Sequence, residues 1–308
     1  MRILASGEPA APAPEAAIEG PWRRAIVEFS RSRLAVVGLV MLVIIVAIAL
    51  TAPWISPQNP YDLAQLDVLE SKLAPGTESS TTGKPYVLGT DDQGRDMLSG
   101  IFYGLRISLM VGVASTLVAA ALGLAMGLAA AYFGGWADAV IMRIVDIQLS
   151  FPSILIALIL LAVLGQGVDK IIVALVTVQW AYYARTVRSA AIVERQKEYV
   201  EAARVLALSR PRIVLRHLLP NCLPPLIVVA TVQVAHAISL EATLSFLGLG
   251  LPITEPSLGL LIANGCQYLL SGKYWISFYP GLALLLTIVA INLVADQLRD
   301  ILNPRLRK

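Results

Sequence analysis

Charged residues, cysteines and histidines are all scarce in this sequence. Asp, Glu, Lys and Arg make up 15% of its 308 residues, whereas soluble domains carry about 25%; this excludes a water-exposed surface over the whole chain. Two cysteines exclude a disulfide-stapled scaffold, and two histidines do not support a metal-binding cluster. A net charge of only +3 disfavours a nucleic-acid-binding protein.

Apolar residues are abundant instead, and they lie in long runs. They make up 57% of the sequence, and the mean hydropathy is +0.72. A helix needs about 20 apolar residues to cross a bilayer, and no alternation typical of a membrane barrel competes with these runs. The sequence therefore predicts an all-α polytopic membrane protein with six transmembrane helices. The predicted spans lie within 34–55, 107–137, 147–168, 171–184, 224–250 and 274–295.

Lysine and arginine are unevenly distributed between these runs. Most of the 24 lie in the segments 2–33, 185–216 and 299–308, which fall on one side of the membrane when six spans are threaded. Cytoplasmic loops carry the excess of Lys and Arg. The N and C termini are therefore predicted to be cytoplasmic, and the segment 56–100, in which acids outnumber bases, is predicted to lie outside.

The same pattern divides the chain into parts. Residues 1–20 are rich in Ala and Pro without the apolar core of a signal peptide, which predicts a disordered leader. In 21–33, Trp22, Ile26 and Phe29 recur with helical spacing among arginines, which favours an interfacial amphipathic helix over an irregular basic flank. The other predicted parts are a first transmembrane helix (34–55), an extracytoplasmic segment (56–104), a transmembrane core (105–298) with a cytoplasmic loop (187–221), and a cytoplasmic tail (299–308).

The loop 187–221, called the coupling loop below, is too polar to be buried in lipid. Residues 194–207 have a helical pattern with Tyr199, Ala203 and Leu206 on one face. Ser209 and Pro211 then predict the start of a second short helix, which is expected to end at Pro220. An apolar stripe outside the bilayer needs a partner, so the pattern favours a docking element over a solvated connector.

The string EAARVLALSRPRIVLRHLLPN (201–221) resembles the docking loop of ABC-importer permeases. Five further segments are similar to the dipeptide, oligopeptide and nickel branch of that family, and over residues 30–308 the chain is most like its C-type subunit. These segments are LGTDDQGRDMLSG (88–100), AYFGGW (131–136), MRIVD (142–146), LSFLGLG (244–250) and LRDILNPR (298–305).

The resemblance implies a type I ABC-importer fold in a bacterial inner membrane. It implies four kinds of partner: a related B-type permease, two ABC ATPase subunits, an extracytoplasmic solute-binding protein, and membrane lipid. ATP and Mg would be bound by the ATPases, with no cofactor on this chain. Di- or oligopeptides are the expected substrates, and nickel chelates or other small solutes are the alternative.

The resemblance also implies which residues dock an ATPase subunit. Glu201 and the small alanines beside it would sit in a groove of that partner. Ala207 stands where the family usually has Gly, and because Ala resists positive φ we expect it to prolong the first helix slightly. The predicted docking residues are Glu201, Ala202, Ala203, Arg204, Ala207, Ser209 and Arg210.

Ionisable and amide side chains within the spans are candidates for the translocation pathway, because such groups usually face a protein interior or a cavity. Glu241 has no obvious partner in its own turn and is the first candidate, with a buried pair to a partner subunit as the alternative. Gln233, His236 and Gln179 are weaker candidates. Arg143 and Asp146, three residues apart, are predicted to form a structural ion pair.

The chain is not expected to be an enzyme. The closest match to a phosphate-binding loop, 76–84, has the wrong glycine spacing, and Pro85 stands where Ser or Thr is needed. No paired catalytic residues appear, which disfavours a membrane-embedded enzyme. A stand-alone secondary transporter or channel is disfavoured because no internal repeat is found and such a protein would not need the docking loop.

Overall fold

A computed structural model describes residues 21–62, 65–80 and 82–302, with side chains from residue 26. The described part is helical, with two isolated β-bridges and no strand. The predicted leader (1–20) and most of the predicted tail (299–308) lie outside the described residues. The elements are α1 (Pro21–Arg31), α2 (Arg33–Ile55), η2 (Val68–Glu70), α3 (Met97–Phe133), α4 (Gly135–Ser150), α5 (Ser153–Leu164), α6 (Val168–Arg195), α7 (Glu198–Val205), α8 (Arg210–Ile213), η3 (Val214–Leu218), α9 (Leu219–Phe246), α10 (Leu258–Cys266), η4 (Leu269–Ser271) and α11 (Trp275–Leu302).

Four helical stretches in the described residues are long and apolar enough to cross a membrane. They are α2, α3, α11 and the continuous stretch Arg210–Phe246, which joins α8, η3 and α9. A fifth candidate is the pair α4 and α5, whose axes are bent by 92°. The prediction of six spans is therefore supported only in part, because four or five candidates are found. Helix α6 would be the sixth span; it is 28 residues long, but it carries charges near both ends.

The predicted third span (147–168) is divided between two helices in the structure. It begins inside α4, is interrupted at Phe151 and Pro152, and continues as α5. Phe151 is extended, with φ −97° and ψ 145°, because a residue before proline avoids the helical region and proline itself donates no hydrogen bond. The true start of this unit is Gly135, after Gly134 at φ +63° ends α3.

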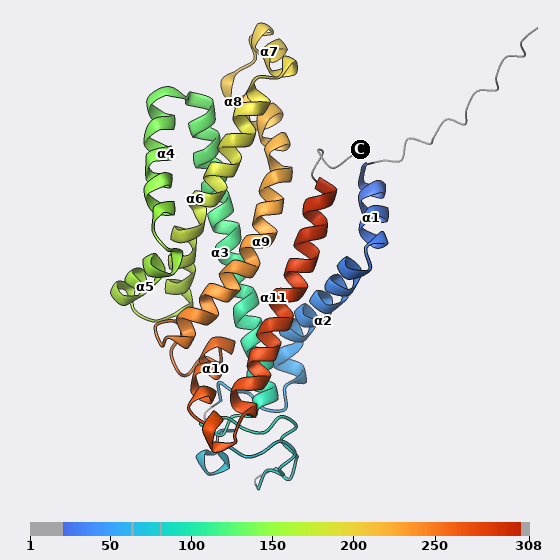
Figure 1. Ribbon diagram of the computed structural model, residues 1–308, viewed down its shortest axis with the longest axis vertical. Helices are drawn as coiled ribbons and strands as arrows, with labels where there is room; N and C mark the ends of the chain where they lie inside the picture. The colour runs from blue at the N-terminus through green and yellow to red at the C-terminus, as the bar shows by residue number, and fades with distance from the viewer. Residues whose placement is uncertain (1–20, 63–64, 81, 303–308) are drawn as a thin grey trace, which may run out of the picture.

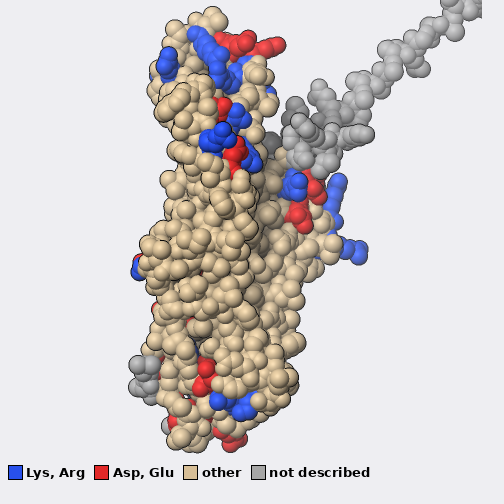
Figure 2. All heavy atoms as spheres, turned by 60° about the vertical axis from the view of Figure 1, so that its left-hand side comes forward, with Lys and Arg blue, Asp and Glu red and all other residues tan. Residues whose placement is uncertain are grey.

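The elements run between two polar ends (Figure 1). The coupling loop with α7 lies at one end, towards which α1 and the end of α11 also point, and the segment 56–96 between α2 and α3 lies at the other end. This segment is called the cap below. Figure 2 shows Lys, Arg, Asp and Glu gathered towards these two ends, with a broad, nearly uncharged band between them. Such a band is the surface expected next to lipid tails.

Helix α3 is central and packs most extensively against α6. The contact passes through Gly123 and Gly127, one turn apart on α3: a Cβ at Gly127 would lie 2.6 Å from the carbonyl oxygen of Ala184, and a Cβ at Gly123 would clash with Tyr183. Small residues four apart let two helix backbones approach closely. The pair therefore fixes α6, and with it the start of the coupling loop, against the centre of the bundle.

Candidate functional site

The coupling loop has an apolar inner face that holds it to the bundle. Val200 and Ala203 of α7 are buried, and they belong to one apolar cluster with Ile213, Leu218 and Ala191 of the flanking helices. Tyr199 and Leu206, which we expected on the same face as Ala203, are exposed instead. The loop is thus a packed helical hairpin, as its sequence pattern indicated, but its buried stripe consists of Val200 and Ala203.

The outer face of α7 is left uncovered by the described residues. Glu201 and Ala202 are exposed, and Val205 and Leu206 are 85% and 73% exposed. We call these four residues the tip surface. The Glu201 amide donates to the Lys197 carbonyl at 3.3 Å, but the Glu201 carboxylate has no hydrogen bond or ion pair with a described residue and can accept one from a partner.

Helix α7 ends abruptly at Ala207. Its φ is +53°, the Leu208 amide donates to the Ala203 carbonyl at 3.1 Å, and the Ala207 amide donates to the Arg204 carbonyl at 2.9 Å. These two bonds are the Schellman arrangement, in which the residue after the cap adopts the left-handed conformation. The expectation that Ala207 would prolong the helix is therefore wrong: Ala207 takes the conformation of the glycine that it replaces.

The second helix of the loop does not end at Pro220, contrary to our expectation. It widens into a π-turn at Val214–Leu218 and continues as α9 into the bundle. Proline lacks the amide that a regular turn would require, and a π-turn is a recognised way to accommodate such a break. A continuous stretch, Arg210–Phe246, therefore connects the loop directly to a candidate span.

A relay of polar side chains fixes the loop to both flanking helices. Glu194, at the end of α6, accepts a hydrogen bond from the Tyr199 hydroxyl at 2.6 Å and pairs with Lys197 at 2.6 Å. Asn221 of α9 donates to the Tyr199 hydroxyl at 3.0 Å. Burial and the bond to Glu194 raise the pKa of Tyr199 to about 12, so the phenol stays a donor. The sequence pattern did not identify this relay because its members lie on three elements.

A large cavity of about 1020 Å³ opens between α6, α9 and α11 at the coupling-loop end. Most of its wall is apolar, and its polar groups come from Tyr182, Thr186, Glu194, Asn221, Gln233 and Arg299. Gln233 is buried, with its amide nitrogen unpaired among the described residues. Of the four predicted pathway residues, Gln233 is the one that lines this cavity.

The other pathway candidates lie elsewhere. Glu241 is fully buried and accepts hydrogen bonds from Ser108 of α3 at 3.0 Å and from Ser245, one turn along α9, at 2.8 Å. It therefore has partners and does not face the large cavity, which corrects our expectation. Gln179 is buried near Thr116, at 3.4 Å, and His236 is exposed on the outer side of α9.

Asp146 pairs with Arg185 of α6 and not with Arg143, which is exposed. The expected pair is therefore wrong, because the tertiary neighbour α6 brings a guanidinium closer than the neighbour on the same helix. Further bonds join the two helices: Arg188 of α6 donates to both carboxylate oxygens of Asp138 at 2.6 Å, and the Trp180 indole of α6 donates to Gln148 of α4 at 2.8 Å. Sequence spacing could not reveal these contacts.

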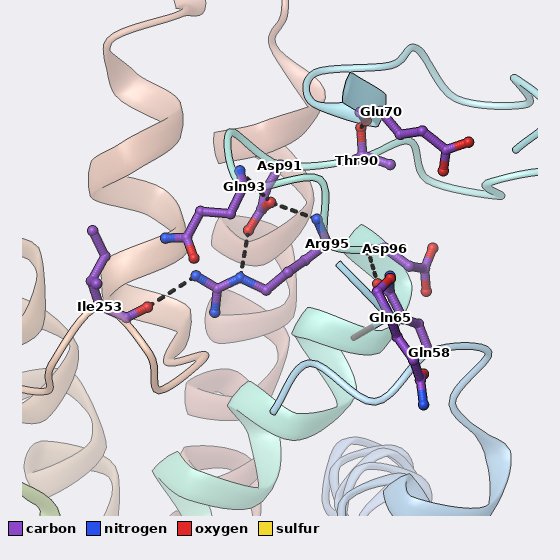
Figure 3. Close-up of polar contacts among 9 residues, drawn as sticks. All are labelled: Gln58, Gln65, Glu70, Thr90, Asp91, Gln93, Arg95, Asp96 and Ile253. Atoms are coloured by element: carbon purple, nitrogen blue, oxygen red, sulfur yellow. Dashed lines mark hydrogen bonds and ion pairs between the residues drawn. The ribbon is translucent and has the colours of Figure 1, made fainter. Parts of the chain in front are cut away.

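The cap is held by buried polar groups (Figure 3). Arg95 pairs with Asp91 at 3.2 Å and donates to the Ile253 carbonyl, at 2.9 Å, in the loop before α10. The Asp96 amide donates to Gln58 at 2.6 Å, and the Asp96 carboxylate caps α3 through the Ser99 amide at 2.8 Å. The cap is therefore an ordered structure that joins α2, α3 and the α10 region.

A second anchor in the cap is the buried carboxylate of Glu70. It accepts hydrogen bonds from the hydroxyls of Tyr86, Ser79 and Ser80 and from the Ser80 amide at 2.5 Å. Burial raises the pKa of Glu70, but the hydrogen bonds outweigh it, so the pKa is lowered to about 2. Glu70 is therefore ionised at neutral pH and orders the 68–86 part of the cap.

Groups of His, Cys, Asp and Glu able to hold a metal ion are absent from the described residues. The described residues instead form a helical hairpin with an exposed tip, a continuous helical stretch that connects it to the bundle, and a cavity.

Comparisons with known proteins agree with this arrangement. Residues 121–308 match the family described as binding-protein-dependent transport system inner membrane component, and residues 20–75 match the N-terminal transmembrane domain of oligopeptide transport permease C. The chain is 40% identical to the dipeptide transport system permease protein DppC of Escherichia coli (strain K12), over 97% of this chain and 96% of that protein. It is 35% identical to DppC of Alkalihalophilus pseudofirmus (strain ATCC BAA-2126 / JCM 17055 / OF4), over 99% and 97%.

A solved structure has a similar fold. An inward-facing conformation of the MetNI methionine ABC transporter aligns with a TM-score of 0.54 and 23% identity, over 67% of this chain and 98% of that chain. The fold of the core is thus that of an ABC-importer permease. The chain therefore belongs to the family of binding-protein-dependent transport system inner membrane components and is a multi-pass protein of the inner membrane.

Proposed function

We propose that this chain is the C-type permease of an ATP-driven importer of di- or oligopeptides. Its relatives are named as dipeptide permeases, which favours peptides over nickel chelates. In this proposal the chain supplies half of a heterodimeric pathway with a B-type permease. ATP and Mg bind to two separate ATPase subunits, and a solute-binding protein docks on the cap.

The observation that carries the proposal is the tip surface and its connection to the bundle. A free carboxylate on Glu201 lies beside the small Ala202 and the exposed Val205 and Leu206, a surface suited to a partner groove. Behind it, the Glu194–Tyr199–Asn221 relay and the continuous stretch Arg210–Phe246 make the hairpin rigid. A rigid hairpin can transmit a partner's movement to the bundle, whereas a flexible loop cannot.

We further propose six spans, with α6 as the sixth. Its middle part is apolar, it packs along α3, and Lys170 and Arg185 near its ends can reach the interfaces by extending their side chains. Both termini and the coupling loop then face the cytoplasm. The large cavity beside Gln233 becomes the cytoplasmic part of the pathway, where its apolar wall suits side chains of varied peptides.

The docking proposal is tested by reversing the charge at the tip surface. Glu201→Arg should abolish co-purification of the ATPase subunits and peptide-driven ATP hydrolysis, because the partner groove then meets a like charge, while membrane insertion is retained. Glu78→Arg is the matched control: it reverses an exposed charge in the cap and should leave ATPase co-purification unchanged.

Two outcomes would contradict this function. One is full ATP-driven uptake with Glu201→Arg. The other is a purified chain that transports substrate without any ATPase subunit, as a stand-alone transporter would.

A further inference from the structure

A second, smaller cavity lies beside the coupling loop. It measures about 230 Å³ and is lined by Tyr132 and Phe133 at the end of α3, Arg195 at the end of α6, and Arg204 and Arg210 on either side of the α7–α8 turn. Three guanidinium groups from separate elements therefore converge on one small space. Its volume suits a small anionic group and is far too small for a folded partner.

The three arginines bring positive charge without a carboxylate to balance it. Arg195 donates to the carbonyl oxygens of Ala131 and Tyr132, at 2.7 and 3.3 Å, which fixes its position and leaves other N–H groups of its five unused. Arg204 and Arg210 are exposed and form no ion pair among the described residues. Guanidinium groups in such an arrangement are well suited to bind phosphate oxygens.

The surroundings of the cavity are those of a membrane interface. Phe133 is 67% exposed and Trp136, just after the α3–α4 turn, is 81% exposed. From Trp136 one face of α4 continues through Val140, Ile144 and Ile147, which are exposed and apolar, with the exposed Arg143 at its edge. Aromatic side chains gather at the boundary between headgroups and tails, and Figure 2 shows the surface change from the uncharged band to charged side chains towards this end of the molecule.

We propose that Arg195, Arg204 and Arg210 bind the phosphate of an anionic phospholipid, with its acyl chains along the apolar face of α4. The occupant is a lipid because an aliphatic surface adjoins the basic cavity. Two of the arginines flank Ala207, so the headgroup ties the turn of the coupling loop to the end of α3. The proposal rests on the proposed function only in assigning this end to the cytoplasmic leaflet.

The test measures lipid binding by the purified, delipidated transport complex. Phosphatidylglycerol and phosphatidylcholine with identical chains are compared by native mass spectrometry at about 0.15 M salt, where exposed charges are screened. We expect phosphatidylglycerol to be retained preferentially. The double variant Arg204→Gln, Arg210→Gln should bind it roughly twentyfold more weakly, since each basic side chain near an anionic lipid contributes a factor of about five.

The matched control is the double variant Arg212→Gln, Arg216→Gln, which removes two exposed arginines of the same loop that do not line the cavity. It should keep wild-type selectivity. Equal losses in both double variants would overturn the proposal by showing a diffuse charge effect. If millimolar phosphate displaced the lipid completely, the cavity would be assigned to free phosphate and the proposal would be overturned. Equal retention of phosphatidylglycerol and phosphatidylcholine would also overturn the proposal. Arg204 and Arg210 are also among the predicted docking residues, so co-purification of the ATPase subunits is measured for each double variant. Loss of phosphatidylglycerol from a complex that retains its ATPase subunits separates lipid binding from the proposed function.

Discussion

At the scale of single residues, the coupling loop depends on backbone conformation as much as on side-chain chemistry. Ala207 is one of two described non-glycine residues with positive φ, the other being Lys72. A left-handed conformation costs a residue with a Cβ roughly 1–2 kcal/mol. The loop carries this strain at Ala207, in the turn between α7 and α8 that directly follows the tip surface.

Ala207→Gly should relieve this strain. We expect a gain of about 1 kcal/mol in the local stability of the loop, after allowing for the extra freedom of glycine in the unfolded chain. The amide of Leu208, bonded to Ala203, should then exchange about fivefold more slowly with deuterium in the assembled complex. Ala202→Gly, in the neighbouring helix, should have the opposite sign, a loss of about 1 kcal/mol. Faster exchange in Ala207→Gly would contradict the left-handed assignment.

The sequence identified some residues of the site and missed others for a clear reason. The local pattern predicted the two helices of the coupling loop, and the family resemblance singled out position 207. They could not reveal that Glu241 bonds to Ser108 or that Asp146 bonds to Arg185, because those partners are distant in sequence and depend on which helices lie side by side.

At the scale of elements, apolar runs marked most helices but not their limits. Helix α3 starts at Met97, ten residues before its apolar run, because its first turns pack against protein: Leu258 and Leu261 of α10 lie against Gly104 and Gly100. Pro152 marked a break, but the 92° bend that follows it depends on how α5 packs against α6 and α9. The local sequence thus determines whether a helix forms, whereas the direction of the helix and its first and last residues depend on tertiary packing.

The α3–α6 contact should be intolerant of even one added methyl group. We expect Gly127→Ala to lose roughly 1–3 kcal/mol, because the new Cβ would lie 2.6 Å from a backbone oxygen that cannot rotate away. The readout is thermal unfolding of the purified complex, followed by size-exclusion chromatography. Gly281→Ala in α11 is the control: nothing lies within 4 Å of its Cβ position, so the same change should be neutral or slightly stabilising. Equal melting temperatures for the two variants would count against the packing assigned to α3 and α6.

At the scale of the whole molecule, the small number of charged residues and their positions in the structure give separate information. The low content of charged residues predicted a membrane protein, and their gathering at two ends leaves an uncharged band between (Figure 2). At one end the charges lie on and around the coupling loop, and at the other some of them are buried inside the cap, as with Arg95 and Asp91. The two ends therefore differ in how their charges are arranged, and the orientation of the chain can be tested.

Cysteine labelling from one side of the membrane tests both orientation and the sixth span. In a Cys266→Ser background, which removes the exposed native thiol and leaves the buried Cys222, single cysteines replace the exposed residues Glu78, Glu28 and Ser209. A membrane-impermeant maleimide applied outside should label Glu78→Cys alone, and permeabilisation should expose the other two. When α2, α3 and the α4–α5 pair all cross the membrane, residues 28 and 209 lie on the same side only if α6 crosses as well. Labelling of Ser209→Cys from outside, with Glu28→Cys protected, would therefore contradict the proposal of six spans and would place the tip surface away from any cytoplasmic ATPase.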